Sequence, residues 1–262
     1  MRLGADFLIL SFMNFTNPYP HTEHEVYSQT FLQTVSANIR FSSSDTQAEY
    51  WQKFREFSKK IFHIPVTDIP SGEDQYAELS SSTTETTYSF KGDTATVAIG
   101  PKGYRSFGET MPVHFCTIQT FLQDVVPSFR IQELSLTKRN RFPFHISLDR
   151  FDLKDALNYV FKPEHTEDLE KYRLEKGKQI KVTKEAQVDL GHQARMQLTI
   201  GFQVMNDSNV HLLFDLHASY VPSEGMEADK LYSLASELND IMFDAFRYVV
   251  TENIIHVLRG EN

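Results

Sequence analysis

Basic side chains gather around one short segment of an otherwise acidic chain. The whole sequence carries 26 Lys and Arg against 35 Asp and Glu, for a formal net charge of −9. The candidate binding residues of this segment are Arg130, Lys138, Arg139, Asn140, Arg141 and His145. Guanidinium groups present paired N–H donors that match a phosphate or a carboxylate. The segment predicts a contact with an anion or a nucleic acid, or else a strand end that ion pairs hold to acidic helices.

The alternation of a β-strand divides this basic segment between two faces. If residues 130–142 form a strand, Lys138 and Asn140 point to one side, while Arg139 and Arg141 point to the other. The cluster is therefore expected to be split between the two sides of a sheet.

A second polar pair lies on a later strand. Asp215 and His217 are two residues apart, so both face away from Phe214 and Leu216. A histidine beside a carboxylate can act as a general base or hold a metal ion. The alternatives are a polar pair on the outer face of a sheet and a pair buried beneath the closing helix.

Two further groups predict no site. His21 and His24 belong to an HTEHE stretch, but Pro18 and Pro20 argue against the helical turn that would bring an i, i+3 histidine pair together. Cys116 lies in an apolar stretch and is expected to be a buried structural thiol. No Walker A or GxGxxG spacing occurs, and we expect no metal and no cofactor.

Composition restricts the compartment and the partners. A single cysteine forms no intramolecular disulfide and fits a reducing compartment, so we expect a cytoplasmic protein. The net charge of −9 argues against binding of nucleic acid or anionic membrane by the whole surface. The apolar Phe7–Phe12 run is short and lies beside Asp6, so a docked strand, or a start upstream of the native Met13, is expected rather than a signal peptide.

Residue periodicity predicts the elements of the first half. Alternation predicts a strand over Phe31–Phe41, and helical spacing predicts a helix from Ala48 to Phe62. Residues 70–82 are polar and predict a loop. A hairpin is expected over Thr86–Phe90 and Thr94–Ile99, then a helix over Val113–Val126 and a strand over Arg130–Phe142.

The second half predicts a meander and a closing helix. A short helix is expected over Leu153–Phe161, and residues 165–178 are expected to be a solvated helix or loop. Strands are expected over residues 179–190, 194–204 and 210–221, joined by turns. An apolar stripe predicts an amphipathic helix of about 30 residues from Glu227, packed on this sheet or in an oligomer interface.

These elements indicate an α+β fold. We expect a mostly antiparallel sheet built from two β-rich halves, packed by amphipathic helices and closed by a long C-terminal helix. The halves are residues 1–145 and 146–262, which form either two units or one continuous domain, with the basic strand at their junction.

Three segments resemble a bacterial family of about 250-residue proteins whose name records only its sporadic distribution. They are the strand FLQTVSANIRF, the basic strand IQELSLTKRNRF and the closing MFDAFRYVVT. The resemblance implies a bacterial source and an α+β fold. It implies no activity, because the family has none assigned.

Two main functions remain open from the sequence, and a holdase-like chaperone with an exposed apolar groove is a third. The first is a non-catalytic macromolecular interaction protein, whose partner is another protein, in a bacterial stress or phage-defence (antiviral) locus; the C-terminal helix could also form a homo-oligomer. The second is a nucleic-acid- or phosphate-ligand-binding protein or enzyme that uses the basic strand at residues 130–141. The patchy family distribution that favours the first is an association rather than a physical argument.

Overall fold

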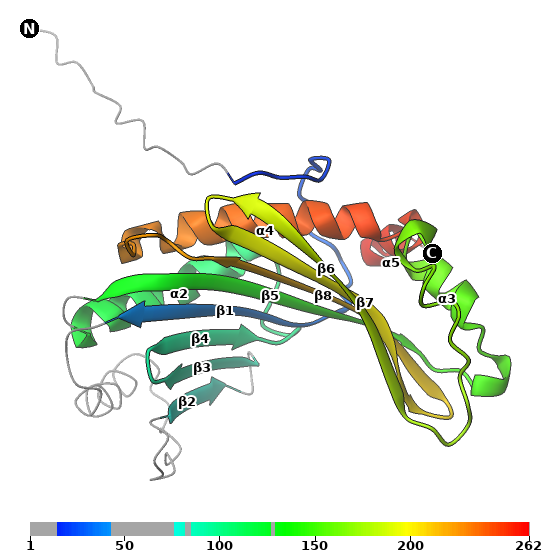
Figure 1. Ribbon diagram of the computed structural model, residues 1–262. Coiled ribbons are helices and arrows are strands. Elements are labelled where there is room, and N and C mark those ends of the chain that lie inside the picture. The colour runs from blue at the N-terminus through cyan, green and yellow to red at the C-terminus, as the bar shows by residue number, and fades with distance from the viewer. Residues whose placement is uncertain (1–14, 43–75, 82–84, 127–128, 262) are drawn as a thin grey trace, which may run out of the picture.

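The computed structural model describes residues 15–42, 76–81, 85–126 and 129–261, which form one antiparallel sheet with helices on one side (Figure 1). In this described part the sheet has eight strands, in the order β2-β3-β4-β1-β5-β8-β7-β6. The strands are β1 (Leu32–Ser42), β2 (Tyr76–Ser81), β3 (Thr86–Lys91), β4 (Thr94–Ile99), β5 (Arg130–Phe144), β6 (Ile180–Gly191), β7 (Ala194–Asn206) and β8 (Asn209–Tyr220). The expected α+β class with a mostly antiparallel sheet is confirmed.

Most strand predictions agree with the structure, and one expected loop does not. The strand at residues 31–41, the hairpin β3–β4, the basic strand β5 and the meander β6–β7–β8 are all present. Residues 76–81, expected as part of a polar loop, instead form the edge strand β2, paired with β3. An edge strand needs only one neighbour, so its sequence shows little of the hydrophobic alternation on which strand prediction depends.

The basic strand β5 lies at the centre of the sheet. It pairs with β1 on one side and with β8 on the other, so the sheet is continuous across residue 145. Lys138 is opposite Val35 on β1 and Leu216 on β8, both of which are buried. Arg139 is opposite Asp215 and therefore faces the other way. The expected division of the basic segment between two faces is confirmed.

Two long helices cover the face to which Lys138 points. They are α2 (Phe107–Val125) and α4 (Leu231–Val249), which lie on the same side of the sheet (Figure 1). Helix α2 begins six residues before the expected start, because Ser106 caps its N-terminus by accepting from the N–H of Glu109. Pro112 lies inside the helix.

The C-terminal helix is shorter than expected. A 3₁₀ turn at Ala228–Lys230 leads into α4, and α5 (Glu252–Arg259) follows as a separate helix. Val250 is extended between them and bridges to Phe161, the residue after α3 (Leu153–Val160). The N–H of Lys162 donates to the carbonyl of Val249. The apolar periodicity continues across this break, which is why it predicted one helix of about 30 residues.

Several sequence predictions lie outside the described residues. They include the apolar Phe7–Phe12 run and the helix expected from Ala48 to Phe62. Among the described helices, none combines the length and apolarity needed to cross a membrane.

Candidate ligand-binding pocket

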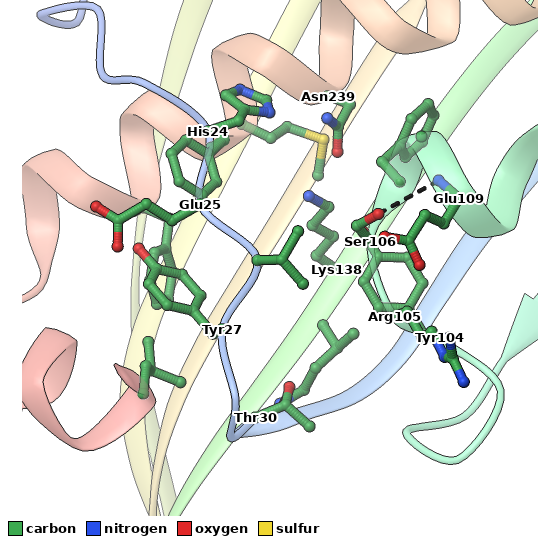
Figure 2. Close-up of a pocket in the computed structure, with 18 of the residues that line it drawn as sticks. His24, Glu25, Tyr27, Thr30, Tyr104, Arg105, Ser106, Glu109, Lys138 and Asn239 are labelled. Carbon is green, nitrogen blue, oxygen red and sulfur yellow. Dashed lines mark hydrogen bonds between the residues drawn. The ribbon is translucent and has the colours of Figure 1, made fainter. Parts of the chain in front are cut away.

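A cavity of about 790 Å³ lies between the sheet and the two long helices, and Lys138 forms part of its floor (Figure 2). Asn140 contributes to the same floor, two residues further along β5. The first turn of α2 and the middle of α4 line two walls, and residues 24–32 of the N-terminal segment line the third. The pocket thus joins parts of the chain that are more than 200 residues apart.

Lys138 is a half-buried cation without a protein partner in the described part of the chain. No hydrogen bond or ion pair reaches its Nζ there. Removal from water lowers the pKa of this amine to about 8, while the negative charge of Asp240 opposes the shift. A desolvated ammonium ion that lacks a hydrogen-bonded counter-ion is unfavourable, so an anion placed beside it would gain more than it would at the surface.

Asn239 supplies a buried acceptor to the same space. Its side chain is 3% exposed, and its Oδ1 has no hydrogen-bond partner among the described residues. The amide Nδ2 donates to Asp240 Oδ1 at 3.3 Å. Figure 2 shows Lys138 rising from β5 toward the space between Asn239 on α4 and Ser106 at the start of α2. Unpartnered buried polar atoms are rare in folded proteins, and a ligand donor would satisfy this one.

The first turn of α2 opens on the pocket. Ser106, Phe107, Gly108 and Glu109 all line it. The N–H groups of Phe107 and Gly108 have no acceptor inside the helix, and the helix dipole makes this end positive. The exposed Arg105 lies beside it. Donors therefore approach the pocket from β5 and from α2.

Aromatic side chains form much of the remaining wall. Tyr27, Tyr104, Phe107, Phe243 and Phe246 come from three separate parts of the chain. Burial raises the pKa of Tyr104, which is therefore neutral at physiological pH. Such walls favour a ligand with an apolar or planar body.

The third wall is an N-terminal strap (residues 15–31) that is tied at both ends. At its start, the buried Asp244 of α4 accepts the N–H of Thr22 and the Nδ2 of Asn17, both at 2.7 Å. At its end, the N–H of Gln29 donates to the carbonyl of Leu258 at 3.0 Å.

Between these ties an ion pair links the strap to α5. Arg259 binds the carboxylate of Glu25 with two nitrogens, at 2.6 and 2.8 Å, and lowers its pKa. The strap is thus fixed across one side of the cavity.

The two histidines of the HTEHE stretch face different carboxylates of α4. His21 Nδ1 lies 3.4 Å from Asp244 Oδ2, and His24 Nε2 lies 3.5 Å from Asp240 Oδ1. Across residues 15–42, 76–81, 85–126 and 129–261, no group of three His, Cys, Asp or Glu side chains is arranged to hold a metal ion.

The rest of the basic segment does not reach the pocket. Arg141 binds Asp215 with both terminal nitrogens, the second at 3.1 Å, on the opposite face of the sheet. Arg130 pairs with Glu227 just before the C-terminal helices. Arg139 is exposed on the opposite face, and His145 is exposed beyond the end of β5. The structure therefore joins only Lys138 and Asn140 of the six candidates in one cavity.

Asp215 and His217 share a face as expected, but they have different partners. Asp215 is held by Arg141, whereas His217 Nδ1 lies 2.9 Å from the hydroxyl of Thr137. Within the described part, no hydrogen bond joins the two side chains. Desolvation lowers the pKa of His217, so the ring is neutral at physiological pH.

The face that carries Asp215 is polar. It presents small hydroxyl, amide and imidazole groups, namely Ser36, Asn38, Ser89, Thr96, Thr137, Gln197, Thr199, His217 and Ser219. Of the described helices, none lies on this side (Figure 1). We call it the open face, and the side with the pocket the covered face.

Cys116 differs from the expectation. It is exposed on α2, although its neighbour Phe115 is buried. The apolar stretch around it contains the buried face of the helix, and Cys116 falls on the opposite side of the same turn. The prediction of a buried thiol was wrong.

Most residues of the pocket carry no recognisable sequence signal. Asn239, Tyr104 and Ser106 carry no motif and are brought together only by the packing of α2 and α4. The one available signal was Ser106 with Glu109 three residues later, a helix-start pattern.

No protein-family model and no curated protein matches the chain. Among solved structures, Methanococcus jannaschii TBP is similar at 14% sequence identity and a TM-score of 0.28, over 81% of this chain and 97% of that one. At this TM-score the likeness carries no information about what the chain binds.

Proposed function

We propose that the protein is a non-catalytic binding protein for a small organic anion, held in the pocket between β5, α2 and α4. The observation that carries this proposal is the half-buried Lys138, whose Nζ has no partner among the described residues and which points into a cavity of about 790 Å³. Ligand pockets of this size combine apolar walls with a few convergent polar groups.

Each wall has a distinct role in this proposal. The carboxylate or phosphate of the ligand binds Lys138 and the free N–H groups at the start of α2. Tyr104, Phe243 and Phe246 pack against its apolar body. A hydroxyl or N–H of the ligand donates to Oδ1 of Asn239.

The carboxylates at the pocket restrict the charge of the ligand. Asp240 and Glu109 line the cavity near Lys138 and disfavour a second, distant negative charge. Glu25 is already neutralised by Arg259. A monoanion with an aromatic or aliphatic body therefore fits better than a polyphosphate.

The test is titration calorimetry with an aromatic carboxylate series and phenyl phosphate. We expect binding to the wild-type chain and at least a tenfold loss of affinity in Lys138→Met, because one charge-assisted hydrogen bond contributes about 1.5–3 kcal/mol. Arg139→Met is the matched control and should bind as the wild type does. Equal affinity in Lys138→Met, or the absence of binding by every member of the series, would contradict the proposal.

A second candidate function is contact with a protein through the open face. Its support is the hydrogen-bonding surface described above, on which Arg40–Glu133 and Arg141–Asp215 are internal ion pairs. These pairs neutralise Arg40 and Arg141, whereas the exposed Arg139 and Arg195 on the same face have no ion pair among the described residues.

The second candidate is tested with a photoreactive residue at Thr199 on the open face and another at Val113 on the exposed side of α2. A protein cross-linked through position 199 should be identified. Once purified, it should bind the wild-type chain, and Thr199→Arg should abolish this binding. Equal capture from both positions would count against a specific surface.

A further inference from the structure

We propose that Lys138 binds carbonyl compounds covalently, by forming a reversible imine with an aldehyde or a 2-oxo acid in the pocket. This inference rests on the proposed function, because it assumes that the pocket takes an organic anion. It adds to the same site a covalent bond between Lys138 Nζ and the ligand, which anion binding alone does not require.

The step balances within the pocket. The lone pair of the neutral Nζ adds to the carbonyl carbon, and one of the two N–H protons passes to the carbonyl oxygen to give a carbinolamine. The hydroxyl then leaves as water with the second N–H proton, and a C=N bond to Nζ remains. No oxidant or reductant takes part, and added water reverses the reaction.

The geometry around Nζ favours the neutral amine that this step needs. Lys138 is half-buried among aromatic and aliphatic side chains, and no carboxylate of the described residues pairs with Nζ. Its lowered pKa of about 8 means that roughly half of the amine is neutral at pH 8, against less than about 1% for an ordinary lysine.

Seven other described lysines are engaged by protein acceptors, unlike Lys138. Lys162 donates to the carbonyl of Tyr248 at 2.7 Å. Six more are held in ion pairs: Lys102, Lys154, Lys171, Lys176, Lys178 and Lys184. In two of these pairs, the partner carboxylate raises the pKa of the amine, Glu85 for Lys102 and Asp149 for Lys176, which disfavours the neutral nucleophile.

Polar groups that line the pocket suit both steps, the formation of the carbinolamine and its loss of water. Oδ1 of Asn239 is an unpartnered acceptor for the hydroxyl of the carbinolamine. Asp240 and Glu109 line the cavity and can carry the proton that leaves with water. The charged and titratable side chains that face the pocket from other elements are His24, Glu25 and Tyr27 on the strap, and Tyr104 and Arg105 before α2.

The experiment is borohydride trapping on the full chain, with 4-formylbenzoate and phenylpyruvate as separate probes. We expect one reduced adduct, mapped by peptide mass spectrometry to Lys138, that forms at least tenfold faster than adducts at other lysines. The two probes distinguish an aldehyde ligand from a 2-oxo acid. The rate of trapping should rise with pH and reach half its maximum near pH 8.

Two variants keep the result interpretable. Lys138→Arg keeps the positive charge and should retain binding of benzoate, but it should give no adduct in the pocket. Asn239→Ala should slow trapping while leaving the site of modification unchanged. If the wild-type chain binds benzoate and neither probe labels Lys138 preferentially, the imine is excluded and the proposed function still stands. If no aromatic carboxylate of the series and no phenyl phosphate binds, the proposed function itself fails.

Discussion

Lys138 and Arg139 are neighbours on the same strand with the same formal charge, yet the two faces of the sheet treat them differently. Lys138 points into a partly desolvated cavity beneath α2 and α4, whereas Arg139 projects from the open face. The contrast shows that charge density along a sequence is a poor guide to function, because the alternation of a strand sends half of the charges to each environment. The dielectric surroundings decide which of these charges can bind tightly.

The two faces also differ in how they satisfy their polar groups. On the open face, two arginines pair with carboxylates of adjacent strands, in Arg40–Glu133 and Arg141–Asp215. On the covered face, Asn239 Oδ1 is buried without a hydrogen-bond partner among the described residues, and no carboxylate there forms an ion pair with the partly buried Lys138. Polar groups that lack hydrogen-bond partners beneath the helices are typical of a binding site rather than of a region that only stabilises the fold.

The largest expected effect is a loss of stability when a packed side chain of β5 is shortened. This loss should be much greater on the covered face than on the open face. Leu136 is 1% exposed on the covered face, so Leu136→Ala should lower the free energy of unfolding by about 2–5 kcal/mol. Thr137→Ala on the open face loses only the hydrogen bond to His217, which is worth about 1 kcal/mol. Urea unfolding measures both. Similar losses in the two variants would mean that the open face is also covered.

The next effect concerns the charge of Lys138. Its pKa is lowered to about 8 in the folded chain but is ordinary in the unfolded one, so the unfolded state binds more protons between pH 8 and about 10.5. The free energy of unfolding should therefore rise across this window, and be smallest at and below pH 8. Because the side chain is only half-buried, the expected rise is about 1–3 kcal/mol.

Other groups titrate in the same window, so the measurement is a difference between two chains. Lys138→Met lacks the amine and should show a correspondingly smaller rise in stability from pH 8 to 10.5. It should also be at least as stable as the wild-type chain at pH 7, because the desolvation penalty is gone. A steeper rise in Lys138→Met than in the wild-type chain would contradict the assigned environment.

The sequence predicted the sheet well because period-2 alternation is a local signal. The meander around Met196–Val204 and Leu212–Tyr220 alternates cleanly and folds as expected. The edge strand at Tyr76–Ser81 and the break at Val250 were missed, since a neighbouring strand specifies the former and a bridge to Phe161 the latter. Both depend on tertiary contacts that no local pattern reports.

The candidate site was predictable only in part. Strand alternation correctly separated Lys138 and Asn140 from Arg139 and Arg141, so half of the cluster could be assigned to one face. Nothing local indicated that the face would be hollowed, or that Asn239 would lie above Lys138. A cavity is a property of how helices pack, and single residues of α2 and α4 do not encode it.

The smallest expected effect tests the open face alone, through the pair Arg141 and Asp215. Both side chains are partly exposed, at 20% and 26%, and the contact is bidentate. Asp215→Ala should cost about 1 kcal/mol, and the exposed Arg139→Ala should change stability by less than about 0.5 kcal/mol. A double-mutant cycle with Arg141→Ala isolates the coupling energy by chemical denaturation. If that coupling is zero at low salt, the arginines of the open face are not engaged with its carboxylates, and their availability to a negatively charged partner would have to be reconsidered.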